Sequence, residues 1–267
     1  MFKAKDVYIN NFELKILQSD IFSNDMSHFF STRVGGDTPK PLQYFTLSAK
    51  DYPLFDNFAQ DNLKIACEII DADVNNLLSP NQQHTDKIAV IKTQDDIKKL
   101  QNEAFDAVIT NLKNIPICLV FADCVPVLLY DEQQKVLACI HAGWKGSAKQ
   151  ISQKAVKIME EEFQCVPLNI KAAIGPSICQ SCFEVNPDVA SQLGMSIKND
   201  YDNIFLKTDE KIHVDLKLLN KQQLNEVGIS KIDISKDCTC CNNSLFYSYR
   251  ADNKLTGRHG MIAMIKE

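Results

Sequence analysis

The densest apolar part of the chain lies between residues 107 and 141, where polar segments divide it into short runs. Short apolar runs bounded by polar or turn-forming residues are typical of β-strands. Residues 131–135 form a polar connection of hairpin length, so we expect the strands on either side to pair antiparallel. The runs predict strands over residues 87–92, 107–109, 117–121, 125–130 and 136–141.

Apolar residues recur every three or four positions over residues 55–70 and 147–163, which predicts two amphipathic helices. Further helices are expected at 187–193 and 216–227. The other predicted strands cover residues 28–34, before a glycine turn, and residues 168–174, 231–234, 245–249 and 260–265. Paired strands mixed with helices, without a regular βαβ alternation, indicate an α+β fold. We expect a single layered domain over residues 1–267, with mixed β-sheets flanked by helices.

The charge balance argues against a nucleic-acid partner. The 267 residues include 34 acidic and 29 basic side chains, and no long basic block is present. The first residues lack the uninterrupted apolar segment of a signal peptide. The longest apolar run is interrupted by Asp123 and two prolines and is too short to span a bilayer. A cytoplasmic protein without a membrane partner is therefore expected.

Ten cysteines are spread over the chain, and without an export signal we expect them to be reduced. Cys67, Cys118, Cys139 and Cys165 lie in apolar or mixed contexts, where a thiol behaves as a small hydrophobic side chain. Cys179-x2-Cys182 and the later group Cys238-x-Cys240-Cys241 are a poor match to paired CxxC zinc knuckles. A four-thiolate structural zinc is therefore only a rival interpretation.

Three chemically active side chains begin or end apolar strands next to turns: His84, Cys124 and His141. Two imidazoles and a thiolate form a reasonable tetrahedral zinc site with an open fourth position, as catalytic zinc requires. The spacings of the three residues are not those of a local metal motif. The same residues also allow a metal-free site in which Cys124 is the nucleophile, His141 its base and Asp123 or another polar group the orienting residue.

A glycine turn after His141 offers an anion site. Residues 143–147, Gly-Trp-Lys-Gly-Ser, connect a predicted strand to a predicted helix, whose first turn presents N–H groups to an anion. Lys145 reinforces the positive charge there. Near the C-terminus, Ser-Tyr-Arg at 248–250 and Thr-Gly-Arg-His-Gly at 256–260 place two arginines around a turn, which is either a solvated loop or part of a site.

Several of these segments together resemble one family. The sequence is similar to the laccase-domain proteins first called multicopper polyphenol oxidases, which are also described as zinc-dependent purine nucleoside phosphorylases and as peptidoglycan editing factor. The matching segments, in family order, are HFFSTRVGG (28–36), QQHTD (82–86), DAVITN (106–111), ADCVPVLLYD (122–131), HAGWKGS (141–147), IGPSICQSCFEV (174–185), HVDLKLLNKQQL (213–224), CTCC (238–241) and FYSYRADNKLTGRHG (246–260).

The resemblance implies that His84, Cys124 and His141 bind the metal, with zinc as the expected ion and copper as the alternative. It implies an α+β layered fold and phosphorolysis of adenosine, inosine, guanosine and methylthioadenosine, with an accompanying adenosine deaminase activity. Purine nucleosides and phosphate are then the partners, and the chain is expected to be a monomer or homodimer. Lys145 stands where Arg is common in the family, which bears on substrate preference.

On this hypothesis, Lys145, Arg33 and Arg250 are the cations expected around the phosphate and the sugar. Asp123 is expected to orient a ligand histidine or to handle a proton. Cys124 and Lys145 complete the predicted catalytic group.

Two alternatives remain open besides the metal-free Cys/His hydrolase. A copper-dependent polyphenol oxidase usually needs more histidines than the five present here. A cell-wall precursor editing factor or partner-binding protein is the other, although no exposed apolar helix or charged tail indicates it. Phosphate-dependent release of free purine base distinguishes both from the phosphorylase.

Overall fold

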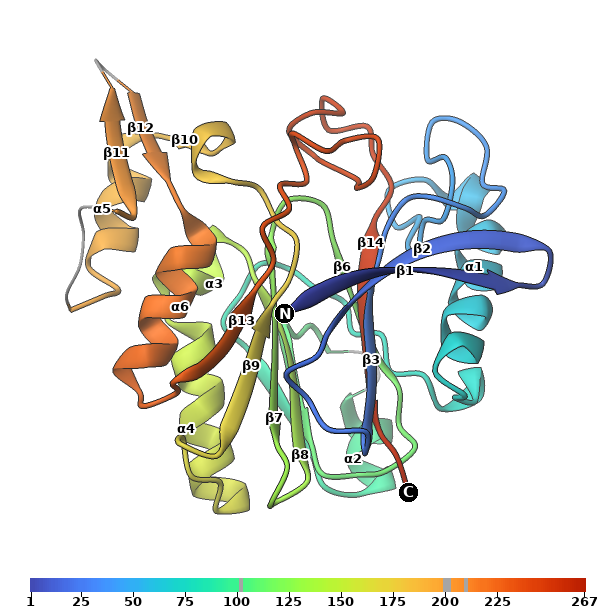
Figure 1. Ribbon diagram of the computed structural model, residues 1–267, viewed down its shortest axis with the longest axis horizontal. Helices are drawn as coiled ribbons and strands as arrows, with labels where there is room; N and C mark the ends of the chain where they lie inside the picture. The colour runs from blue at the N-terminus through green and yellow to red at the C-terminus, as the bar shows by residue number, and fades with distance from the viewer. Residues whose placement is uncertain (101–102, 199–202, 209–210) are drawn as a thin grey trace.

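Two β-sheets pack face to face at the centre of the protein, and helices cover their outer sides (Figure 1). The computed structural model describes residues 1–100, 103–198, 203–208 and 211–267. Within these ranges, the first sheet has five strands, all paired antiparallel, in the order β1-β2-β3-β14-β6. Its strands are β1 (Phe2–Ile9), β2 (Phe12–Ser19), β3 (Met26–Ser31), β6 (Ile117–Phe121) and β14 (His259–Ile265).

The second sheet has six strands in the order β13-β9-β7-β8-β5-β4 and is mixed. Its two outer pairs, β13 with β9 and β5 with β4, are parallel, and the inner pairs are antiparallel. The strands are β4 (Ile88–Ile91), β5 (Ala107–Thr110), β7 (Val125–Asp131), β8 (Val136–Ala142), β9 (Ile170–Ile174) and β13 (Lys231–Ile234).

Helices and a small third sheet complete the described part of the chain. The third sheet joins β10 (Glu184–Val185), β12 (Lys211–Val214) and β11 (Phe205–Thr208). The α-helices are α1 (Asp56–Ile69), α2 (Gln94–Leu100), α3 (Trp144–Ala148), α4 (Ile151–Phe163), α5 (Pro187–Gly194) and α6 (Leu216–Glu226). Short 3-10 helices are η1 (Pro53–Phe55), η2 (Val74–Asn76) and η3 (Gln180–Cys182).

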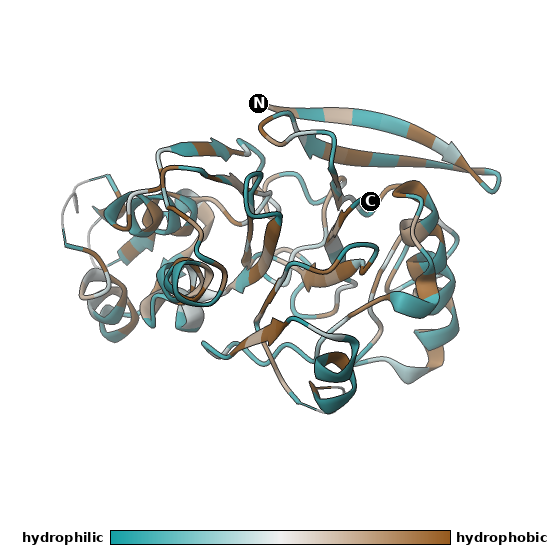
Figure 2. Ribbon diagram, turned by 90° about the horizontal axis from the view of Figure 1, so that it is seen from below, coloured by the Kyte–Doolittle hydropathy of each residue, from teal (hydrophilic) through white to brown (hydrophobic). Residues whose placement is uncertain are grey.

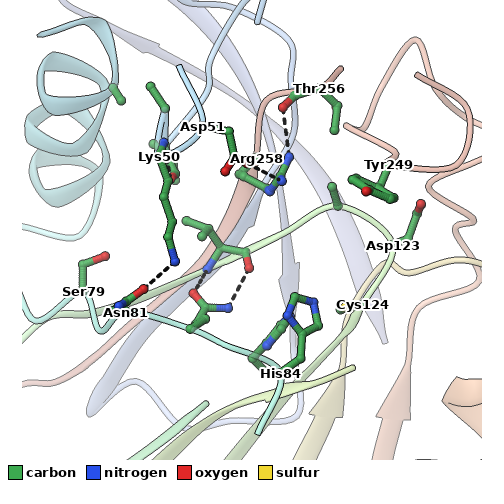
Figure 3. Close-up of a pocket in the computed structure, with 18 of the residues that line it drawn as sticks. Lys50, Asp51, Ser79, Asn81, His84, Asp123, Cys124, Tyr249, Thr256 and Arg258 are labelled. Carbon is green, nitrogen blue, oxygen red and sulfur yellow. Dashed lines mark hydrogen bonds and ion pairs between the residues drawn. The ribbon is translucent and has the colours of Figure 1, made fainter. Parts of the chain in front are cut away.

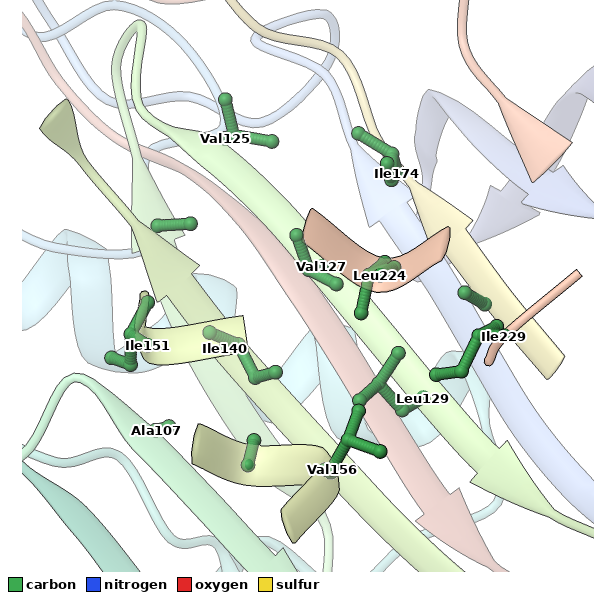
Figure 4. Close-up of a cluster of buried hydrophobic side chains, with 14 of the residues drawn as sticks. Ala107, Val125, Val127, Leu129, Ile140, Ile151, Val156, Ile174, Leu224 and Ile229 are labelled. Atoms are coloured by element: carbon green, nitrogen blue, oxygen red, sulfur yellow. The ribbon is translucent and has the colours of Figure 1, made fainter. Parts of the chain in front are cut away.

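The six-stranded sheet is buried on both faces. Successive residues of a strand point to opposite sides, so Val127 and Leu129 pack against the helices with Val156 of α4 (Figure 4), whereas Leu128 and Tyr130 pack on the side of the five-stranded sheet. This double burial explains why β7 and β8 are continuous apolar runs in the sequence instead of alternating ones.

The five-stranded sheet is covered on its outer side by α1, through Ile65 and Ala66, which join one apolar cluster with Phe29 and Ile262. The order of layers is therefore helix, sheet, sheet, helix (Figure 1). The β1–β2 hairpin extends along one side of the molecule and carries alternating hydrophilic and hydrophobic residues (Figure 2). Across the described residues, no helix combines the length and the apolar character needed to cross a membrane.

The predicted α+β class with mixed sheets and flanking helices is confirmed, but two predicted elements are wrong. The predicted helix 147–163 is two helices, α3 and α4, because Gln150 between them adopts a left-handed conformation with φ 60°. The predicted strand 245–249 is a series of turns, in which the N–H groups of Leu245 and Phe246 donate to the carbonyl of Asn242. No element was predicted for residues 1–19, which contain β1 and β2.

Candidate metal centre and pocket

Cys124 and His141 lie together at the open end of the β7–β8 hairpin. The antiparallel register pairs Val125 with Ala142 and Pro126 with His141, so Cys124, directly before β7, lies beside the end of β8. The predicted hairpin is confirmed. It brings the thiol and the imidazole to the same end of a rigid pair of strands.

His84 reaches the same place from the loop that precedes β4. Its backbone has a left-handed φ of 57°. The side-chain amide of the neighbouring Gln82 donates to the Val120 carbonyl and accepts from the Val120 N–H, both at 2.8 Å. The loop that carries His84 is therefore anchored to β6 of the other sheet.

Asp106 connects the His84 loop to His141. It is fully buried and directly precedes β5. Its Oδ1 lies 2.8 Å from His141 Nδ1 and accepts the His84 N–H at 2.9 Å, and its Oδ2 accepts the N–H and hydroxyl of Thr85 at 2.6 and 2.8 Å. Because Nδ1 of His141 is engaged, its Nε2 is the atom available to a metal.

Sequence reasoning missed Asp106, although the signal was present: it is a carboxylate directly before an apolar strand, at the start of the segment DAVITN. Burial raises the pKa of Asp106, but the hydrogen bonds from His141 and Thr85 outweigh it and hold the pKa well below its ordinary value. The carboxylate is therefore charged and able to hold the imidazole in one orientation.

The thiol and the imidazole also shift one another's protonation. Burial raises the pKa of Cys124, but the charge and hydrogen bonding of His141 and the hydrogen bond of His84 together lower it below its usual value. Burial lowers the pKa of His141, but Cys124 and Asp106 raise it above its usual value. The arrangement thus favours a thiolate, which is the form that binds metals.

The ligand atoms of His84, Cys124 and His141 lie within 4.8 Å of one another. With Zn–S near 2.3 Å and Zn–N near 2.0–2.1 Å, the ligand atoms of one tetrahedral zinc are about 3.3–3.8 Å apart, so small side-chain adjustments suffice. His141 is buried, Cys124 half-buried and His84 exposed. The trio is thus closed by protein on one side and open on the other.

The open side faces a cavity of about 930 Å³, which all three residues line. In Figure 3, Lys50 and Arg258 lie on one side of this pocket and His84 and Cys124 on the other. The Arg258 guanidinium is 3.4 Å from Asp51 and donates to two backbone carbonyls. Arg258 is one of the two arginines that the sequence places around the C-terminal turn, and the structure puts it in the pocket. Nothing in the local sequence of Lys50 indicates that it faces the trio.

Asp123 and Arg250 also line the pocket and are directly connected. The Asp123 carboxylate accepts the Arg250 N–H and the Ser248 hydroxyl at 2.7 Å each, and the Thr239 hydroxyl at 2.6 Å. These hydrogen bonds hold the 248–250 turn at the rim of the pocket. The carboxylate that contacts a ligand histidine is Asp106.

Arg33 is not among the residues that line the pocket. Its guanidinium is buried, donates to the carbonyls of Asn243 and Gln43, lies 3.5 Å from Asp252 and stacks 4.7 Å from the centre of the Tyr247 ring. These contacts tie the strand end after β3 to the C-terminal loop. A substrate role for Arg33 stays a prediction.

Lys145 is also outside the pocket lining. It is exposed on α3, and its Nζ lies 5.7 Å from the centre of the Trp144 ring, which does line the pocket. The catalytic and phosphate-binding roles of Lys145 likewise stay predictions.

Gly143, the residue before α3, is in close contact with the metal-ligand side chains. A Cβ at this position would lie 3.0 Å from His84 Cδ2 and 3.1 Å from Cys124 Sγ. Gly143→Ala is therefore expected to push two ligands apart and to weaken metal binding by about tenfold, the lower end of the loss that disturbed ligand support produces. The zinc concentration that half-restores metal to chelator-treated protein measures this. An unchanged value would show that the ligands have room to move.

Comparisons with known proteins agree with this fold. The family described as "Multi-copper polyphenol oxidoreductase laccase" matches residues 27–266. Purine nucleoside phosphorylase YlmD of Bacillus subtilis (strain 168) is 31% identical over 246 residues, which cover 89% of this chain and 88% of that protein. Adenosine deaminase RL5, from an unknown prokaryotic organism, is 34% identical over 70% of this chain and 74% of that protein. The crystal structure of Bacillus licheniformis hypothetical protein YfiH has a TM-score of 0.88 at 29% identity and covers 97% of this chain and 100% of that one.

Proposed function

The chain belongs to the multi-copper polyphenol oxidoreductase laccase family, and on this premise we propose that it is a zinc-dependent purine nucleoside phosphorylase. Its substrates are adenosine, inosine, guanosine and methylthioadenosine, and adenosine deamination is its second activity. Relatives named purine nucleoside phosphorylase and adenosine deaminase support this proposal. The observation that carries it is the convergence of His84, Cys124 and His141 in one cavity.

The donor set fits zinc. Two imidazoles and a thiolate match zinc's preference for nitrogen and sulfur ligands, and three protein ligands leave the fourth position free, as in catalytic sites. Asp106 holds His141 in the manner of the carboxylate–histidine pairs that support zinc ligands. When bound, the ion supplies Lewis-acid chemistry beside the substrate.

The cavity suits a nucleoside and an anion. Its volume of about 930 Å³ is in the range of small-molecule sites. Trp144, Phe183 and Tyr249 provide aromatic surface for the base, and Arg250 and Arg258 provide positive charge for phosphate.

In phosphorolysis a phosphate oxygen bonds to C1′ of the ribose while the bond from C1′ to the purine nitrogen breaks. The two arginines lower the free energy of the phosphate in the site, and Asp123 is the residue proposed to handle the proton that the departing base requires.

Product analysis tests the proposal. Adenosine, inosine and methylthioadenosine are each incubated with the protein, with and without phosphate, and the free base, ribose phosphate and deaminated nucleoside are quantified. We expect free base and a sugar 1-phosphate to form only when phosphate is present: ribose 1-phosphate from adenosine and inosine, and 5-methylthioribose 1-phosphate from methylthioadenosine. Absence of base release from all three nucleosides by zinc-loaded protein would refute the phosphorylase.

The metal-free alternative has support from one arrangement: Cys124, His141 and Asp106 stand in the order of nucleophile, base and orienting carboxylate. Chelation separates the two functions, because a Cys/His hydrolase would keep its activity without metal. We expect chelator-treated protein to lose base release and to regain it with zinc. Full activity of metal-free protein would favour the hydrolase.

The copper oxidase and the editing factor differ from the phosphorylase in their products. Within the described residues, the trio is one of two groups able to hold a metal, and the other consists of cysteines alone, so no cluster of histidines for several copper ions is present there. Copper-loaded and zinc-loaded protein are to be compared for base release and for oxidation of a phenol. Phenol oxidation without base release would favour the oxidase.

A further inference from the structure

Four cysteines outside the pocket form a second group with the geometry of a metal site. Cys179 directly precedes η3 and Cys182 is its last residue, and Cys238 and Cys241 lie in the segment after β13. Their sulfur atoms all lie within 4.8 Å of one another, and none of these residues lines the pocket. We propose that these four thiolates hold a structural zinc ion that stabilises one wall of the nucleoside pocket.

The four cysteines are spaced as two CxxC pairs in the folded protein. The structure brings together Cys238 and Cys241 and leaves out Cys240, so the second half of the group is a CxxC pair like the first. Paired CxxC segments, one from each of two loops, are the usual ligand pattern of a four-cysteine zinc site. The poor match inferred from the sequence arose because three cysteines compete for two positions.

The sulfur–sulfur distances fit ligands of one ion. The Sγ atom of Cys241 is 3.4 Å from that of Cys182 and 3.9 Å from that of Cys179. Four sulfurs arranged tetrahedrally at a Zn–S distance of about 2.3 Å are about 3.8 Å apart. A disulfide needs about 2.0 Å, and all ten cysteines of the structure are free.

Backbone N–H groups point at one of the sulfurs. Cys238 Sγ accepts the N–H of Cys179 at 3.2 Å and the N–H of Cys241 at 3.3 Å. The two donors converge on this sulfur and fix its position in the group. The hydrogen bond from Cys179 also joins the two CxxC segments directly, because Cys179 and Cys238 belong to different segments.

Two positively charged side chains lie next to the group. They offset part of the excess negative charge that four thiolates would carry around one zinc ion. The buried Lys217 of α6 donates to the carbonyls of Ser235 and Asp237, in the segment that leads into Cys238. Arg250 donates to the carbonyl of Cys182 at 2.9 Å. Both cations are thus held by the backbone beside the proposed ligands.

The same contacts connect the cysteines to the pocket. The N–H of Ile178, directly before Cys179, donates to the Asp123 carbonyl at 3.1 Å, and the hydroxyl of Thr239, directly after Cys238, donates to the Asp123 carboxylate. Asp123 and Arg250 both line the pocket. Since the cysteine segments lie in turns and a short 3-10 helix, a four-coordinate ion with no open position would keep this wall in place.

Metal analysis of protein purified with a reductant tests the proposal. We expect the parent to contain about two zinc ions per chain, one at each site. Cys241→Ser should contain about one, because removing one of the four thiolate ligands releases the ion that they hold together. The matched control is Cys240→Ser, because Cys240 is adjacent but outside the group, and it should keep the parent's zinc content. Cys124→Ala should lose the other ion only, so failure of the pocket site and failure of this site are separately visible.

Cobalt bound in place of zinc gives a second test of four-sulfur coordination, in a variant whose two CxxC segments are unchanged. Cobalt-loaded Cys124→Ala should show the intense thiolate-to-cobalt charge-transfer absorption and the visible bands of tetrahedral four-sulfur coordination. Absence of these bands overturns the proposal even if Cys241→Ser fails to fold. Unchanged zinc content in Cys241→Ser, or a Cys182–Cys241 disulfide in the reduced preparation, overturns it as well.

Discussion

Replacing Cys124 by alanine is expected to lower phosphate-dependent cleavage of inosine by about 1,000-fold or more. The estimate follows because Lewis-acid chemistry contributes several kcal/mol to a reaction barrier and about 1.4 kcal/mol corresponds to a tenfold change in rate. Alanine removes the one anionic ligand of the trio and leaves His84 and His141 with a site too weak to retain the ion. The kcat/KM for inosine and the zinc content of the same sample are the measurements.

Cys165→Ala is the matched control for this substitution. Cys165 is a buried thiol that packs in the apolar cluster on the helix side of the six-stranded sheet, away from the pocket lining. It should keep the parent's kcat/KM and zinc content. If Cys124→Ala cleaves inosine at the parent rate, the metal-dependent reaction proposed for this pocket is wrong.

Asp106→Asn is expected to weaken zinc binding at the trio by about 10- to 100-fold, as the loss of a carboxylate behind a ligand histidine does. It should also lower the free energy of unfolding by about 2–3 kcal/mol, because hydrogen bonds to a buried charged group are lost. The NH2 group of the new amide replaces one of the two carboxylate oxygens, so its donors oppose either those of His141 and His84 at Oδ1 or those of Thr85 at Oδ2. Zinc titration of chelator-treated protein, followed by recovery of activity, gives the affinity, and urea denaturation gives the stability.

Asp131→Asn distinguishes the two effects. Asp131 is equally buried but lies at the other end of the β7–β8 hairpin, where its carboxylate accepts the N–H groups of Gln133 and Gln134. It should lose stability without a change in the zinc concentration that restores activity. If Asp106→Asn needs no more zinc than the parent, Asp106 supports the fold alone and does not position His141.

Much of the secondary structure was predictable because its cause is local. β7 and β8 are apolar runs with a polar connection between them, so an antiparallel hairpin, with Cys124 and His141 at its open end, follows from the sequence pattern and is present in the structure. The prediction failed where backbone conformation at one residue decided the outcome: the left-handed Gln150 divides 147–163 into two helices, although the apolar spacing continues through it. It also failed at 245–249, where buried apolar residues occupy turns instead of a strand.

The sequence by itself determined the residue types of the metal centre and the hairpin that carries two of them. The tertiary structure alone placed His84 beside them, through a loop held by Asp106 and by the backbone of Val120. It also selected Cys238 and Cys241 over Cys240 and brought Lys50 and Arg258 into the pocket. The physical reason is the distance along the chain over which each feature is decided. Apolar periodicity is a pattern among neighbouring residues, whereas a site assembled from separate loops depends on hydrogen bonds and packing between segments far apart in sequence.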